Sequence, residues 1–235
     1  MTKKIHIGPS LLAANPLNLE YALNCIHETD ADYLHCDVMD GLYVPNFGLS
    51  LNSIEKIRDY SSLPIDVHFM TKNMDLPFSW SINFKPNSVT FHPETVMHVH
   101  RHVECLKSKG IRVGLAFNPS TSLQILDEIH DILDYVLVMG VNPGFCGQQF
   151  IPSACTKIRR IKQNFPALPI QVDGGISLKT IQPCFASGAT SFVCGSSLFS
   201  NVFHENSTSK SLEKNIEFLK SQLHVLRQST EIPQK

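Results

Sequence analysis

Histidine, aspartate and methionine alternate in the segment LHCDVMDG, where His35, Asp37 and Met39 are separated by Cys36 and Val38. Successive side chains of a β-strand point to opposite faces, so a strand here would place the imidazole, the carboxylate and the thioether on one face. Such a face could bind a metal ion and move a proton.

A second segment, PIDVHFM, repeats the arrangement with Asp66, His68 and Met70, and a third, PIQVDGG, carries Asp173 before two glycines. Two histidines and two of these carboxylates could converge if the strands are neighbours in a sheet. Nitrogen and oxygen donors of this kind suit a borderline divalent ion such as zinc, iron(II), manganese or cobalt. The alternative is that the histidines are buried core residues, which is the better interpretation for one isolated histidine but not for this set.

Glycine-rich turns follow three apolar runs, in NPGFCGQ, VDGGI and GSSLF. Glycine leaves the backbone N–H groups open, and consecutive N–H groups at a barrel rim or a helix N-terminus can hold a phosphate. The residues expected to contact a phosphate are Gly144, Phe145, Cys146, Gly147, Gly174, Gly175, Gly195 and Ser196.

Short β-branched and apolar runs position these residues, and they begin near residues 5, 32, 64, 88, 112, 135, 169 and 191. Segments with helical spacing lie around residues 17–26, 53–59, 99–109, 123–129, 154–165, 178–186 and 211–228. This alternation is typical of parallel βαβ units, and eight strands predict an α/β fold of the (β/α)8 TIM-barrel type. An open, doubly wound sheet is the alternative, because periodicity does not distinguish it from a closed barrel. No linker divides the chain, so we expect one domain over residues 1–235, with a weakly ordered tail after about residue 227.

The amino-acid composition indicates which classes of binding partner and which cellular compartment to expect. The chain has 20 basic and 21 acidic residues, so no overall field would attract nucleic acid or an anionic membrane. Its seven cysteines are widely spaced without a CxxC pair, which predicts reduced thiols rather than disulfides or a structural zinc site. No signal-length or membrane-length apolar run occurs. We therefore expect a soluble cytoplasmic protein that acts on a small molecule.

The motifs HCDVMDG, YVPNFG, DVHFM, VNPGFCGQQF, VDGGI and GSSLF occur together and in this order. Over about residues 5 to 200 the chain resembles the ribulose-phosphate 3-epimerase family. This resemblance implies a barrel of the ribulose-phosphate-binding type and an isomerase that inverts carbon 3 of D-ribulose 5-phosphate to give D-xylulose 5-phosphate through a cis-enediolate. It also implies a homo-oligomer, either a dimer or a hexamer.

By the same resemblance, Asp37 and Asp173 would be the two acid/base residues. One divalent ion per subunit, zinc in the first place, would be held by His35, Asp37, His68 and Asp173. The remaining residues that the resemblance assigns to the substrate are Ser10, Met39, His68, Met70 and Met139, of which the methionines would cap the enediolate.

Two alternatives to the pentulose epimerase stay open. Residues 71–87, the HPET stretch at His92 and the NPSTS stretch at Asn118 are similar to the hexulose branch of the family, such as allulose-6-phosphate 3-epimerases. A non-catalytic sugar-phosphate-binding barrel is a more distant alternative.

Cys146 stands where family sequences usually have glycine, so it could alter the phosphate loop or form an oxidation-sensitive thiol. The run from His98 to His102 is interpreted as a solvated helix.

Overall fold

The computed structural model describes residues 5–199 together with residues 217, 221, 224, 225 and 228. Parallel strands form at all eight of the predicted positions. Their bounds are β1 (His6–Pro9), β2 (Leu34–Met39), β3 (Ile65–Met70), β4 (Ser88–Phe91), β5 (Arg112–Phe117), β6 (Tyr135–Met139), β7 (Ile170–Asp173) and β8 (Ser191–Cys194).

The sheet closes into a barrel. Its hydrogen-bonded order is β1-β8-β7-β6-β5-β4-β3-β2, which follows the chain around the ring without a reversal. A parallel bridge between Ser10 and His35 joins the two remaining edges. A doubly wound sheet would reverse its strand order and leave two edges open, so the predicted TIM-barrel class is confirmed.

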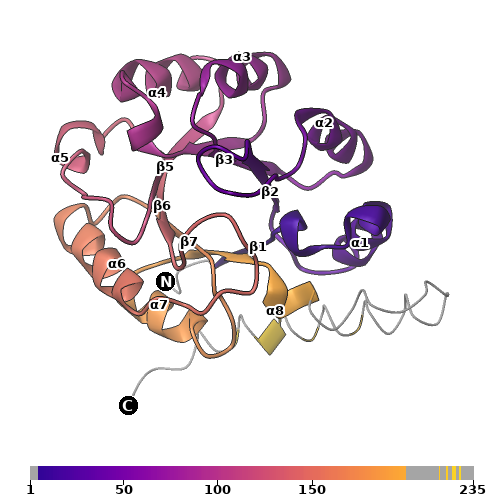
Figure 1. Cartoon of the computed structure of the whole chain (residues 1–235). Coiled ribbons are helices and arrows are strands. Elements are labelled where there is room, and N and C mark those ends of the chain that lie inside the picture. The colour runs from indigo at the N-terminus through magenta and orange to yellow at the C-terminus, as the bar shows by residue number, and fades with distance from the viewer. Residues whose placement is uncertain (1–4, 200–216, 218–220, 222–223, 226–227, 229–235) are drawn as a thin grey trace.

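Helices surround the barrel, as Figure 1 shows with the strands at the centre. Most lie where helical spacing predicts them. Their bounds are α1 (Leu19–His27), α2 (Leu51–Tyr60), α3 (Asp75–Phe84), α4 (Val99–Lys107), α5 (Leu126–Ile129), α6 (Ser153–Asn164), α7 (Ile181–Ser187) and α8 (Ser196–Phe199). None of the described helices is both long enough and apolar enough to cross a lipid bilayer.

Helix α3 is not among the predicted helices. Its sequence, DLPFSWSINF, contains Pro77 and lacks a regular polar face. The proline is tolerated because it lies in the first turn, where its missing N–H has no intrahelical partner. Trp80 then stacks on Phe84 at 4.4 Å and packs edge-on against Phe69 of β3 at 6.2 Å. Tertiary packing therefore forms a helix that local pattern does not indicate.

The strand register determines which side chains meet inside the barrel. His35 pairs with Asp66, and Asp37 pairs with His68, across the β2–β3 ladder. The alternate residues of the same strands, such as Cys36 of β2, join the apolar core between the barrel and its helices. The face of β2 and of β3 that carries the histidines and aspartates therefore points into the barrel.

The predicted C-terminal helix over residues 211–228 and the predicted tail after about residue 227 lie outside the described residues, apart from the isolated positions named above. The single-domain organisation over residues 1–235 stays a prediction.

Candidate metal centre and active site

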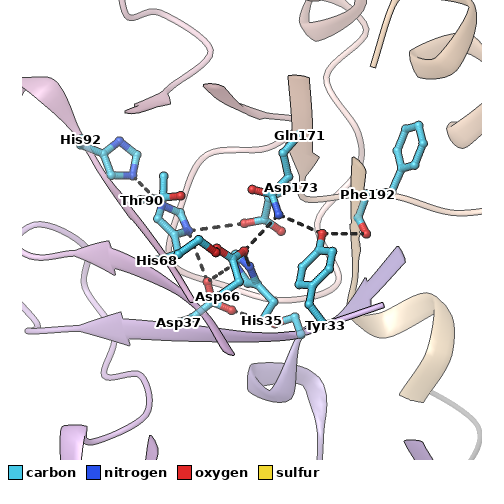
Figure 2. A network of polar contacts seen from close by, with 12 residues as sticks. Tyr33, His35, Asp37, Asp66, His68, Thr90, His92, Gln171, Asp173 and Phe192 are labelled. Atoms are coloured by element: carbon cyan, nitrogen blue, oxygen red, sulfur yellow. Dashed lines mark hydrogen bonds and ion pairs between the residues drawn. The ribbon is translucent and has the colours of Figure 1, made fainter. Parts of the chain in front are cut away.

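Four polar side chains converge at the carboxyl ends of the strands. His35 and Asp37 come from β2, His68 from β3 and Asp173 is the last residue of β7. Figure 2 shows the four side chains close together. One ligand atom from each lies within 4.8 Å of the others. The Oδ1 atom of Asp37 is 3.3 Å from Nε2 of His35 and 3.4 Å from Nδ1 of His68. Nδ1 of His68 is 3.7 Å from Oδ2 of Asp173.

Two ring nitrogens of this cluster lack a hydrogen-bond partner among the described residues: Nε2 of His35 and Nδ1 of His68. Both rings are fully buried. A buried polar atom left unpaired costs about 1–3 kcal/mol, so two such atoms facing the same carboxylates call for a common partner. Two imidazole nitrogens and two carboxylates are a donor set that zinc and similar divalent ions accept. The residues present therefore fit a metal ion.

The electrostatics of the cluster favour a cation. Burial alone would raise the pKa of Asp37, but His35 and His68 outweigh it and hold that pKa well below its usual range. Burial alone would lower the pKa of His35, but Asp37 and Asp66 raise it well above its usual value. A positive charge, carried by a proton or by a metal ion, is thus stabilised between these groups.

Ser10 lies directly after β1 and donates a hydrogen bond from Oγ to Oδ2 of Asp37 at 2.7 Å. The hydroxyl thereby fixes the carboxylate oxygen that does not face the histidines. A contact of Ser10 with substrate stays a prediction.

Asp66 shares a strand face with His68 but does not join the cluster. Its Oδ2 atom accepts a hydrogen bond from Nδ1 of His35 at 2.8 Å, on the side of that ring away from Asp37. Burial would raise the pKa of Asp66, but His35, and after it Ser88, lower it. Of Asp37, Asp66 and Asp173, the first and the last therefore form the cluster and Asp66 supports it. The register of β2 against β3 decides this, and no sequence spacing reveals it.

His92, just beyond β4, is absent from the predicted site residues. It is fully buried, and its Nε2 atom lies 3.0 Å from Nε2 of His68. Burial and the neighbouring His68 hold the pKa of His92 well below its usual value, so its ring is neutral. Its position in HPET, after the end of a strand, gave no periodic signal for this contact.

A pocket opens above the cluster at the same end of the barrel. Its lining includes Asp37, Asp173 and the side chains of Met39, Met70 and Met139. Every residue predicted to bind substrate or phosphate lines this pocket except His68, which is fully buried. Residues of the lining that were not predicted are Leu12, Val141, Pro143, Gln148, Ile176 and Val193.

The glycine-rich loops form one wall of the pocket, and their shape depends on glycine. Gly144 and Gly175 have φ values of +119° and +69°, which other residues rarely adopt. The loop after β6 is held by hydrogen bonds from Asn46 Nδ2 to the carbonyl of Gly144 at 2.7 Å and from Gln148 Nε2 to the carbonyl of Phe145 at 3.0 Å. No lysine or arginine lines the pocket among the described residues, so an anion here would depend on backbone N–H groups and on neutral side chains such as the Ser196 hydroxyl.

The segments that are similar to the hexulose branch do not line this pocket, although His92 contacts His68 of the cluster. Residues 71–87, 92–95 and 118–122 do not contribute to its lining. Cys146 does line it, but positive φ values occur within the loop only at Gly144 and Gly147, so the cysteine imposes no left-handed strain. The segments similar to the hexulose branch therefore do not touch the pocket directly.

Comparison with known proteins gives a consistent result. A family model described as the ribulose-phosphate 3 epimerase family matches residues 6–199. A ribulose-phosphate 3-epimerase of Buchnera aphidicola is 39% identical over 201 residues, which cover 83% of this chain and 88% of the relative. The protein of the same name from Escherichia coli is 38% identical, covering 84% of this chain and 90% of the relative. That from Rhodospirillum rubrum is 42% identical, covering 75% and 80%.

Solved structures of a mutant tryptophan synthase alpha-subunit from Pyrococcus furiosus also resemble the chain. One has a TM-score of 0.68 at 17% identity and covers 97% of this chain and 100% of its own. At this level of identity the likeness concerns the barrel fold alone.

Proposed function

Because the chain belongs to the ribulose-phosphate 3-epimerase family, we propose that it interconverts D-ribulose 5-phosphate and D-xylulose 5-phosphate by inverting carbon 3. The observation that carries this proposal is the pair Asp37 and Asp173, which share one cluster with two unpaired histidine nitrogens. Two carboxylates are what an inversion through proton transfer requires, one to remove the proton and one to return it.

His35 through Nε2, His68 through Nδ1, Asp37 and Asp173 would hold one divalent ion per subunit. Zinc is our first choice, with iron(II), manganese and cobalt as alternatives, because all accept mixed imidazole and carboxylate ligands. When bound, such an ion supplies Lewis-acid stabilisation of negative charge on the substrate oxygens.

Asp37 and Asp173 would act as the two acid/base residues. They project from β2 and β7, which are separated by β1 and β8 around the barrel, so they would approach carbon 3 from different sides. One carboxylate takes the proton from one epimer, and the other delivers a proton to the opposite face of the cis-enediolate. Positioned acid–base catalysis contributes only about 10²- to 10⁴-fold of the at least ~10⁶-fold that enzymes reach, so electrostatic stabilisation of the enediolate must supply the rest.

Met39, Met70 and Met139 would keep water from the enediolate. They are nearly fully buried and line the pocket beside the carboxylates. A thioether offers no acidic proton, so a proton abstracted by an aspartate would return to carbon. The same methionines also pack on core residues, Met139 for example on Leu137, and this packing fixes their positions.

The phosphate of the substrate would lie against the loops after β6, β7 and β8. Backbone N–H groups around Gly144, Gly175 and Gly195 would bind it, which orients the sugar so that carbon 3 meets the aspartates. We further propose a cytoplasmic enzyme that assembles as a homo-oligomer, as a dimer or a hexamer.

The test is turnover of D-ribulose 5-phosphate, beside D-allulose 6-phosphate, by protein stripped of metal and reloaded with zinc, iron(II), manganese or cobalt. We expect no activity without metal and a preference for the pentulose after reloading. A preference for the hexulose would assign the chain to the allulose-6-phosphate branch. Inactivity with every metal and both substrates would leave a sugar-phosphate-binding barrel without catalysis.

A further inference from the structure

The two site histidines face the cluster with different ring nitrogens, His35 with Nε2 and His68 with Nδ1. On each ring the other nitrogen has a buried partner: Asp66 for His35 and His92 for His68, as Figure 2 shows. We infer that Asp66 and His92 are positioning residues that fix the tautomers of the two histidines, so that each presents its lone pair to the metal ion. This inference rests on the proposed function.

Asp66 can accept hydrogen bonds but, as a carboxylate, cannot donate one. It receives a hydrogen bond from Nε2 of Gln171 at 3.0 Å, from Oγ of Ser88 at 2.5 Å and from the hydroxyl of Tyr135 at 3.1 Å, in addition to the one from His35. These donors occupy both oxygens and keep the carboxylate charged and immobile. The proton of neutral His35 therefore lies on Nδ1, and Nε2 keeps its lone pair toward Asp37.

His68 has no carboxylate at the corresponding place. Its neighbour in the β3–β4 register is Thr90, whose hydroxyl is 2.7 Å from that of Tyr135 and is thus already engaged. The ring instead reaches past the end of β4 to His92. The tautomer of His68 is therefore fixed by His92, which lies beyond the end of β4 and not on a neighbouring strand.

The contact between His68 and His92 joins two Nε2 atoms, so one proton serves both. If Nδ1 of His68 binds the ion, the proton lies on Nε2 of His68 and Nε2 of His92 accepts it. The proton of neutral His92 then lies on Nδ1, which makes no hydrogen bond with the described residues and has Oε1 of Glu94 as a neighbour at 3.8 Å. Glu94 is itself held by hydrogen bonds from the Tyr43 hydroxyl at 2.8 Å and from Asn118 Nδ2 at 2.7 Å.

The His92 ring is also fixed sterically. It stacks on His68 with 5.1 Å between ring centroids, lies tilted against the Tyr43 ring at 4.8 Å, and has no exposed surface. An outer partner that orients a metal-binding histidine commonly changes metal affinity by about 10- to 100-fold when it is removed. A histidine that only fills space would not affect the affinity for metal in this way.

The first arm of the test needs no substitution. Nitrogen-15 NMR of the zinc-loaded wild-type protein should show the proton of His35 on Nδ1, that of His68 on Nε2 and that of His92 on Nδ1. Any other set of tautomers would overturn the inference, and because the wild-type protein is used, this result does not depend on the folding of a variant.

The second arm measures zinc affinity by competition with a fluorescent chelator. Asp66→Asn removes the charge at nearly constant shape, and His92→Phe keeps the stacked ring but removes the acceptor. Each should weaken zinc binding by about 10- to 100-fold. His92→Gln, which restores an acceptor oxygen, should lose less than His92→Phe.

Matched controls make the same chemical changes elsewhere. Asp134→Asn alters a carboxylate that accepts a backbone hydrogen bond from Val113 at 2.8 Å, away from the pocket. His102→Phe alters a histidine of α4 that packs on Phe78 at 4.6 Å. Both controls should bind zinc as the wild type does. Wild-type zinc affinity in Asp66→Asn and His92→Phe would overturn the inference.

Failure of the inference and failure of the proposed function give different results. A wild-type protein that binds zinc with the assigned tautomers but epimerises neither ketose phosphate would refute the function and retain the positioning roles. A metal-dependent epimerase whose zinc affinity is unchanged by both substitutions would refute the positioning roles and retain the function. A wild-type protein that binds no divalent ion would refute both.

Discussion

The metal cluster and the glycine-rich loops border the same pocket but are built in opposite ways. His35 and His68 are fully buried side chains on strands, fixed by the register of the sheet. The loop after β6 is open to solvent, and Phe145 is 51% exposed. The cluster depends on which side chains are present, and the loops depend on which backbone conformations are possible. Substitutions in the two regions should therefore fail in different ways.

The charges differ as well. The cluster concentrates carboxylates and histidines, whereas the described residues of the loops bring no lysine or arginine to the pocket. We expect changes in the cluster to affect proton transfer and metal binding, and changes in the loops to affect the affinity for phosphate. The predictions below test this division, from the largest expected effect to the smallest.

The largest effect is expected for Asp173→Asn. An amide cannot take up the proton from carbon 3, so kcat should fall by about 10²- to 10⁴-fold. Exchange of the carbon-3 proton with deuterated water, followed by NMR, should disappear for one epimer and persist for the other. Asp59→Asn, an exposed change on α2, is the control and should leave both rates intact. Exchange from both epimers at wild-type rates would refute the two-base mechanism.

The second prediction concerns His68→Ala. Loss of a direct ligand should weaken zinc binding by more than the about 100-fold that loss of an outer partner causes. Metal content after dialysis, measured by mass spectrometry, should fall to background while circular dichroism shows a folded barrel. His102→Ala, on α4, serves as the control and should keep its zinc. A fully metallated His68→Ala protein would exclude His68 as a ligand.

The sequence predicts the features that depend on a single strand or on the recurrence of strands, but not those that depend on contacts between elements. Strand alternation places His35 with Asp37, and eight recurrent runs predict the closed barrel. Alternation does not reveal that Asp66 lies level with His35, because that depends on the register between two strands. His92 comes after the end of β4 and meets His68 only through the path of a loop. Helix α3 depends on the packing of Trp80, and local pattern does not indicate it.

The third prediction tests the loops through Gly175→Ala. The residue has φ +69°, and an added Cβ would lie 2.9 Å from Cα of Phe150, so the main chain must move. Strain of about 1–3 kcal/mol should raise KM and the inhibition constant for inorganic phosphate by about 10-fold or more, since 1.4 kcal/mol is a factor of ten. We expect a smaller change in kcat.

Gly110→Ala is the matched control for Gly175→Ala. Its φ is +79°, but an added Cβ would have nothing within 4 Å, and the residue lies outside the pocket. It should lower the free energy of unfolding without altering KM. If Gly175→Ala kept the wild-type KM and the wild-type affinity for inorganic phosphate, the loop after β7 would not be a phosphate site.

The smallest effect concerns Cys146, where the two regions meet. Its side chain reaches the surface, yet partial burial and, after it, the charges of Asp37 and Asp173 raise the pKa of the thiol to about 12. The thiol is therefore protonated at neutral pH, which argues against an oxidation-sensitive residue.

Alkylation of Cys146 by iodoacetamide, followed by mass spectrometry, should be slow at pH 7.5, and its rate should rise about tenfold per pH unit until the pH approaches 12. Zinc loading should offset the two carboxylates, lower the pKa and speed the reaction, while Cys105 on α4 reacts alike in both forms. Equal rates for Cys146 with and without zinc would show that the loop does not sense the charge of the cluster.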